Sequence, residues 1–147
     1  MNLLLTKCPR GIPIGFILAL ADRPFNRLSV GKRQWVLIVR AIAQGTGLIL
    51  LDEPTSSLDY SNQIHIRQNL RKIAEQGVTL LARSHDPNHV SWYCDQLIAM
   101  NDEGILAQGR PADVLSQDNL DRIYRGVCSV KKLGSYQIIV PQEVLDA

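Results

Sequence analysis

The sequence has few aromatic residues, no strong excess of either charge and no paired cysteines, and each shortage excludes a class of protein. Phe, Trp and Tyr make up 5% of the 147 residues, too few for the row of rings on which single-stranded nucleic acid stacks. The formal net charge is only +2, so no nucleic-acid partner is expected. Cys8, Cys94 and Cys128 form no C-x-x-C spacing, which disfavours a disulfide framework and a zinc cluster and favours a reducing compartment.

Long hydrophobic runs are also missing. An uncharged run at 11–21 ends in Ala-Leu-Ala and imitates a secretory signal. Pro13 and Gly15 interrupt it, and it falls short of the ~20 apolar residues that span a bilayer. We therefore expect no transmembrane helix and leave residues 1–19 as an unassigned N-terminal segment, with a signal peptide as the lesser alternative.

What the sequence does have is an alternation of helical and extended patterns from Lys32 onward, which indicates an α/β protein. An almost wholly apolar helix is expected over 32–44, and it must be covered on most sides. The continuous apolar run at 48–51 is typical of a strand buried on both faces. An amphipathic helix over 61–76 and a second buried strand over 78–82 follow.

The C-terminal part is expected to hold short elements. Asp86-Pro87 is N-cap chemistry for a helix that reaches about Tyr93. Two extended stretches at 96–101 and 105–108 flank a turn with Gly104. Helical segments are predicted up to residue 115 and over 117–125, followed by a hairpin of 128–132 with 136–140 around Gly134-Ser135.

Two adjacent carboxylates, Asp52 and Glu53, follow the apolar run at 48–51. Ligands of α/β proteins bind at such strand ends. Consecutive side chains of a strand point to opposite faces, so we expect the two acids to divide metal holding from proton handling. The simpler alternative is a pair of solvated acids that open a turn at Pro54.

Three further patterns surround these acids. Leu28-Ser29-Val30-Gly31-Lys32-Arg33-Gln34 precedes the long helix, and a small hydroxyl with free amides at a helix N-terminus forms an anion site. Ser56-Ser57-Leu58-Asp59 follows the acids, and His85 follows the next apolar strand.

In this order and spacing, the motifs closely resemble the ATP-binding subunits of ABC transporters over residues 20–115. The resemblance implies the C-terminal half of an ABC-type P-loop nucleotide-binding domain over residues 20–147. That fold is a mostly parallel sheet with flanking helices and a C-terminal hairpin.

The resemblance also implies roles for individual residues. Asp52 corresponds to the acid that holds hydrated Mg²⁺, Glu53 to the base that polarises the attacking water, and His85 to the switch histidine that senses the γ-phosphate of ATP. Ser29 and Gly31 correspond to signature residues that reach the nucleotide held by the opposite subunit. Asp59 would lie in the loop that couples the two sites.

The sequence departs from the family in two respects. It contains no G-x-x-x-x-G-K-[ST] phosphate-binding loop. Around Gly31-Lys32, Asn26 stands where the motif requires its first glycine, and Arg33 stands where it requires Ser or Thr. In the signature, Val30 replaces the first of two glycines, which adds bulk and resists positive φ. We therefore expect the chain alone not to hydrolyse ATP.

The remaining polar residues have simpler interpretations. His85 and His89 lie four apart, but no third ligand converges on them, so a metal site there is disfavoured. His65 is expected on a solvated helix face, and Cys94 and Cys128 as small buried side chains rather than reactive thiols.

The stretch at 109–115, residues 119–124 and the final hairpin resemble the tail of importers for metal chelates such as iron-siderophore, haem or cobalamin complexes. The main hypothesis is therefore an ATPase component of such an importer, present as a fragment without the Walker A half. ATP and Mg²⁺ would be its cofactors, and a second ATPase subunit and a membrane permease subunit its partners, at the cytoplasmic face of the membrane. The alternatives are a non-catalytic module that pairs with an intact ATPase subunit and, less favoured, a secreted binding protein.

Overall fold

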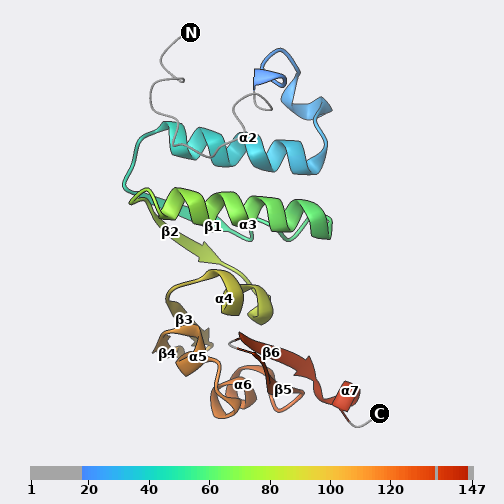
Figure 1. Ribbon diagram of the computed structural model, residues 1–147, viewed down its shortest axis with the longest axis vertical. Helices are drawn as coiled ribbons and strands as arrows, with labels where there is room; N and C mark the ends of the chain where they lie inside the picture. Colours follow the sequence, from blue (N-terminus) through green and yellow to red (C-terminus); the bar gives the residue numbers. More distant parts are fainter. Residues whose placement is uncertain (1–17, 135, 146–147) are drawn as a thin grey trace. The chain divides into compact units, whose positions relative to one another are not determined.

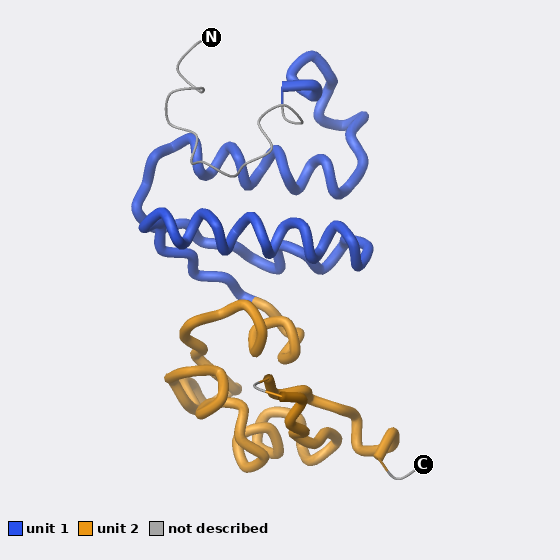
Figure 2. The backbone as a smooth tube through the Cα atoms, viewed as in Figure 1, with its two compact units in different colours: residues 1–83 blue, residues 84–147 orange. Residues whose placement is uncertain are grey.

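The structure is a computed structural model that describes residues 18–134 and 136–145 (Figure 1). Residues 1–17, which include most of the signal-like run and Cys8, lie outside this part, as does Ser135. The chain forms two compact units, residues 1–83 and 84–147 (Figure 2). Unit 1 contains η1 (Phe25–Arg27), α2 (Val30–Ala43), β1 (Leu48–Asp52), α3 (Tyr60–Ala74) and β2 (Thr79–Arg83).

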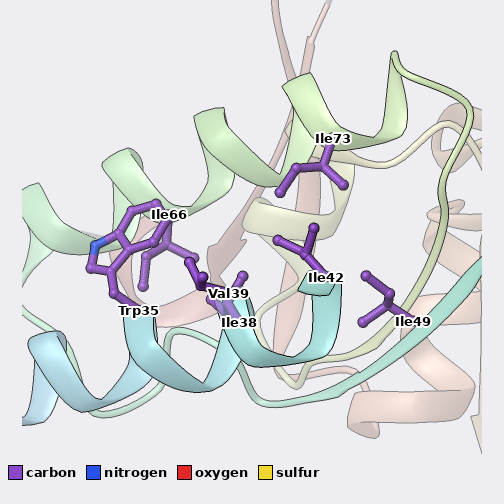
Figure 3. Close-up of a cluster of buried hydrophobic side chains, with 7 residues drawn as sticks. All are labelled: Trp35, Ile38, Val39, Ile42, Ile49, Ile66 and Ile73. Carbon is purple, nitrogen blue, oxygen red and sulfur yellow. The ribbon is translucent and has the colours of Figure 1, made fainter. Parts of the chain in front are cut away.

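The core of unit 1 lies between α2, α3 and β1. Figure 3 shows the buried side chains that point into this space. They are Trp35, Ile38, Val39 and Ile42 from α2, Ile49 from β1, and Ile66 and Ile73 from α3. This packing fixes the two long helices against the parallel pair of strands.

The ends of both helices follow from local chemistry. Asp59 caps α3, because its carboxylate accepts a hydrogen bond from the backbone N–H of Asn62 at 2.9 Å. After α2, Gly45 takes a φ of 68°, the left-handed conformation that commonly ends a helix. The observed helices begin one or two residues before the predicted ones.

The prediction that β1 and β2 are buried on both faces was wrong for the described part of the chain. The strands pair in parallel, with Ile49 beside Leu80 and Leu50 beside Leu81. Ile49 is 6% exposed, but its neighbour Leu50 is 69% exposed. Because side chains of a strand alternate between faces, one face packs on the helices and the other is bare. Helix α2 is covered more fully, since Trp35, Ile38, Val39 and Ile42 are buried and Leu37 is exposed.

This bare face, formed by Leu48, Leu50 and Leu81, predicts self-association and binding of a hydrophobic dye. Leu50→Lys should lower dye fluorescence and the associated fraction, with a change in unfolding free energy within about 0.5 kcal/mol. Ile49→Lys places the same charge in the core and should cost more than about 3 kcal/mol. Dye titration, sedimentation and denaturant unfolding measure these effects, and equal dye binding by wild type and Leu50→Lys would refute the bare face.

Unit 2 is built from short elements. It contains α4 (Pro87–Tyr93), β3 (Leu97–Asn101), β4 (Gly104–Gly109), α5 (Pro111–Val114), α6 (Gln117–Tyr124), β5 (Cys128–Leu133), β6 (Tyr136–Pro141) and α7 (Gln142–Leu145). Strands β3 and β4 form one antiparallel hairpin, and β5 and β6 form another. Both hairpins and the cap of α4 by Asp86 are as the sequence predicts.

The core of unit 2 contains Leu115, Leu120, Cys128 and Ile139. Burial raises the pKa of the Cys128 thiol, as expected for a structural cysteine. Asn88 joins α4 to β6, because its side chain donates to the carbonyl of Ile139 at 3.0 Å and accepts from the Ile139 N–H at 2.8 Å.

The sheets of the described residues are three separate pairs, of which only β1–β2 is parallel. The α/β class and the C-terminal hairpin are thus confirmed, whereas the parallel sheet is narrower than expected. Within these residues no helix is long and apolar enough to cross a membrane.

Candidate functional site

The two acids lie at the open end of the β1–β2 pair. Asp52 is the last residue of β1, and Glu53 follows it with a φ of 44°. The expectation that alternation along a strand separates the two side chains was wrong, because the strand ends before Glu53. A left-handed non-glycine residue costs about 1–3 kcal/mol and is typical of functional sites.

Hydrogen bonds on both sides hold Glu53 in this conformation. Its N–H donates to the carbonyl of Arg83 at 3.1 Å, which ties it to the end of β2. Its carbonyl accepts from the Ser56 N–H at 3.3 Å and from the Ser56 hydroxyl at 3.2 Å. The turn that follows β1 is therefore closed on itself.

Helix α3 fixes the loop of residues 53–59, which we call the acid loop. The buried Arg67 donates to the Thr55 hydroxyl at 2.9 Å. One turn earlier, the amide of Gln63 donates to the carbonyl of Leu58 at 2.9 Å. An arginine on an amphipathic helix is ordinarily solvated, so this anchor could not be predicted from the sequence.

Asp59 closes the acid loop as the N-cap of α3. The Asn62 backbone and side-chain amides both donate to its carboxylate, at 2.9 and 2.6 Å. These hydrogen bonds lower the pKa of Asp59, because they favour its charged form. Its negative charge complements the positive end of the helix dipole.

The N-terminus of α2 packs on the same loop. A Cβ added to Gly31 would lie 3.5 Å from a methyl carbon of Leu58 and 3.7 Å from the Asn62 side chain. Ser29 is the N-cap residue, but its hydroxyl makes no capping hydrogen bond and it is exposed. No acidic residue lies in the first turn, so this helix end keeps donors and a positive field available to an anion.

Arg33 holds the segment before α2 through two hydrogen bonds. Its guanidinium donates to the carbonyl of Leu28 at 2.8 Å and to that of Asn26 at 2.8 Å. Val30 begins the helix with its side chain exposed. Among the described non-glycine residues only Glu53 and Arg125 have positive φ, so the backbone of Val30 carries no left-handed strain in this structure, and its side chain adds bulk at the start of the helix.

The carboxylate of Asp52 has a partner that the sequence did not reveal. Asp52 and Arg83 are register partners in β1 and β2, and Arg83 Nη1 lies 3.0 Å from Asp52 Oδ1. This hydrogen bond raises the pKa of Arg83, and the charges of Asp52 and Glu53 add to the effect. The two residues lie 31 positions apart in the sequence, and the register of the two strands brings them together.

His85 belongs to unit 2, in the exposed segment before α4. His89 is engaged in the same unit, where its Nδ1 lies 2.6 Å from Asp86. No group of three or more metal-ligating side chains occurs among the described residues, and His65 lies exposed on α3 as expected. Unit 1 thus carries Asp52 at the end of β1, Glu53 and Asp59 in the acid loop that follows, and Gly31 packed against that loop.

The chain resembles known proteins in both sequence and structure. A family model described as "ABC transporter" matches residues 14–56. The hemin import ATP-binding protein of Rhodococcus jostii is 42% identical over 74% of this chain and 37% of its own length. The ferric enterobactin transport ATP-binding protein of Escherichia coli is 40% identical over 78% of this chain and 42% of its own length. A metal-chelate type ABC transporter, solved in an inward-facing conformation, matches with a TM-score of 0.77 and 32% identity over 87% of this chain and 53% of its own.

The chain belongs to the ABC transporter ATP-binding family. It spans about two fifths of the length of the curated relatives it matches. The matched part of the ABC ATPase fold therefore includes β1 with Asp52 at its end, the acid loop held by α3, and helix α2.

Proposed function

We propose that this chain supplies the metal-holding, water-activating and signature elements of an ATP site in an ABC importer. The observation that carries the proposal is the strand end and loop that bear the acids: Asp52 ends β1, Glu53 and Asp59 lie in the acid loop that follows, and the N-terminus of α2 packs against this loop. The residues that hold the phosphates must come from another part of the assembly, because the 147 residues contain no G-x-x-x-x-G-K-[ST] sequence.

Asp52 and Glu53 fit the needs of Mg²⁺-dependent phosphoryl transfer. Mg²⁺ prefers oxygen ligands and keeps several waters, and the exposed Asp52 carboxylate can accept hydrogen bonds from that shell. When bound, Mg²⁺ would offset the charge that develops on the transferred phosphoryl group. Glu53, held by its turn, would accept a proton from the attacking water.

The N-terminus of α2 is proposed to face nucleotide held by an opposite subunit. Ser29 and the N–H groups of the first turn would donate to phosphate oxygens, with the helix dipole behind them. Asp59 would report contact across that interface through Leu58, its neighbour in the acid loop, whose methyl carbon lies 3.5 Å from where a Cβ added to Gly31 would stand. His85 is proposed as the group that senses the γ-phosphate.

The transported substrate is proposed from the relatives. Those quoted above are named for hemin import and for ferric enterobactin transport, so we infer a metal chelate as cargo. A second ATP-binding subunit and a membrane permease would be the partners, and the chain would work at the cytoplasmic face of the membrane.

A second candidate is a non-catalytic module that binds an intact ATP-binding subunit and changes its activity. The exposed Val30 side chain at the start of α2 favours it, because a valine occupies space through which backbone would approach a phosphate. The two candidates differ in whether Glu53 ever acts on water.

The experiment that tests the proposal measures phosphate release by the isolated chain with Mg²⁺ and ATP. Positioning and charge stabilisation supply most of phosphoryl-transfer catalysis, and this sequence lacks the loop that provides both. We expect the wild-type rate to equal that of the Glu53→Gln variant. A wild-type rate clearly above this control would overturn the proposal that the phosphate cradle comes from elsewhere.

A further inference from the structure

Arg83 forms an ion pair with Asp52, the residue proposed to hold the metal. Both side chains are largely exposed, at 76% and 74%, yet the guanidinium lies 3.0 Å from the carboxylate on which Mg²⁺ would depend. The backbone fixes this juxtaposition, because the two residues are register partners and the Glu53 N–H also donates to the carbonyl of Arg83.

We propose that Arg83 is a built-in competitor of the divalent cation at Asp52, so that this site takes up Mg²⁺ only at concentrations above those a free carboxylate would need. This inference rests on the proposed function, since it takes Asp52 as the metal-holding acid. It assigns to Arg83 the role of a residue that sets the affinity of this site for the cation.

Two physical effects produce the competition. The guanidinium uses Asp52 Oδ1 as its acceptor, and a cation or one of its waters needs the same oxygen lone pairs. Arg83 also keeps its positive charge at every accessible pH, so it repels a divalent cation over a few ångströms. Because both side chains are exposed, the guanidinium can rotate away and the competition is reversible.

Stability does not explain the pair. An exposed ion pair typically adds little to folding free energy, because water screens it and two long side chains lose freedom. Arg71 and Glu75 form such a pair on α3, at 3.4 Å. The Arg83 pair differs in that its carboxylate is the one at the end of β1, beside Glu53.

The test titrates the full chain with Mn²⁺ alone and follows bound metal through water-proton relaxation. Four variants are compared with wild type: Arg83→Met, Arg83→Lys, Arg71→Met and Asp52→Asn. Arg71→Met is the matched control, because it removes one arginine charge from an exposed ion pair of the same unit. The part of the signal that Asp52→Asn abolishes belongs to the site.

We expect Arg83→Met to lower the Mn²⁺ concentration at half-saturation of that site about five- to tenfold, the effect of one nearby charge on a divalent ion at moderate salt. Arg83→Lys should stay near wild type, since it keeps the charge, and Arg71→Met should equal wild type.

Equal half-saturation concentrations for wild type and Arg83→Met, at a site whose signal Asp52→Asn abolishes, would overturn the inference. Failure of the proposed function has a different signature, which is Mn²⁺ binding that Asp52→Asn leaves intact. That result would place the metal away from the strand end, whatever Arg83 does.

Discussion

A fusion that joins a P-loop-bearing segment of an ABC transporter ATP-binding protein ahead of residue 20 should hydrolyse ATP, and Glu53→Gln should lower its rate at least about a hundredfold. General-base catalysis contributes about 10²–10⁴ in rate, and glutamine keeps the size of the side chain but cannot accept the proton. The hydrogen bonds described for this turn are made by the backbone of Glu53 and by Ser56, and glutamine retains these backbone groups. Steady-state phosphate release measures the loss.

The control for this substitution is Glu103→Gln. Glu103 is exposed in the turn between β3 and β4, and the substitution removes the same charge with no proposed role in chemistry. It should leave the rate of the fusion unchanged. A Glu53→Gln fusion that keeps more than about a tenth of the activity would exclude Glu53 as the base.

The second large effect concerns the start of α2. An importer ATP-binding subunit that carries a P-loop, but whose own signature serine is replaced by arginine, should be activated weakly by this chain. Val30→Gly should raise that activation about tenfold or more, because it removes a side chain that stands 52% exposed at the helix start. Ser29→Arg should abolish it, since a long side chain fills the position of the hydroxyl. Steady-state ATPase of the subunit, titrated with each variant, gives the comparison.

Val127→Gly is the matched control for this series. Val127 is 63% exposed and belongs to unit 2, so the same truncation there tests the loss of a valine side chain at a position outside the signature. Equal activation by wild type, Val30→Gly and Ser29→Arg would show that the signature helix has no remaining role.

Local chemistry made most of the elements predictable. The caps Asp59 and Asp86 accept hydrogen bonds from amides two or three residues along the chain, and such interactions are legible in sequence. The two antiparallel hairpins follow from alternating apolar residues around glycine-containing turns. The location of Asp52 and Glu53 at a strand end was predictable for the same reason.

What the sequence could not show depends on distant parts of the chain. The pairing of Asp52 with Arg83 requires the register of two strands. The burial of Arg67 requires the acid loop to fold back over α3. The exposure of Leu50 depends on whether another element packs on its face of β1. The pattern of apolar residues alone does not determine this.

The most direct test of the account is single-turnover phosphate release by the fusion with excess enzyme over ATP and saturating Mg²⁺. This measurement isolates the chemical step from nucleotide exchange. The account predicts rapid release by the fusion, at least about a hundredfold slower release after Glu53→Gln, and none above the control from the isolated chain. Equal single-turnover rates for the fusion and its Glu53→Gln variant would contradict the claim that the acid at the end of β1 activates water.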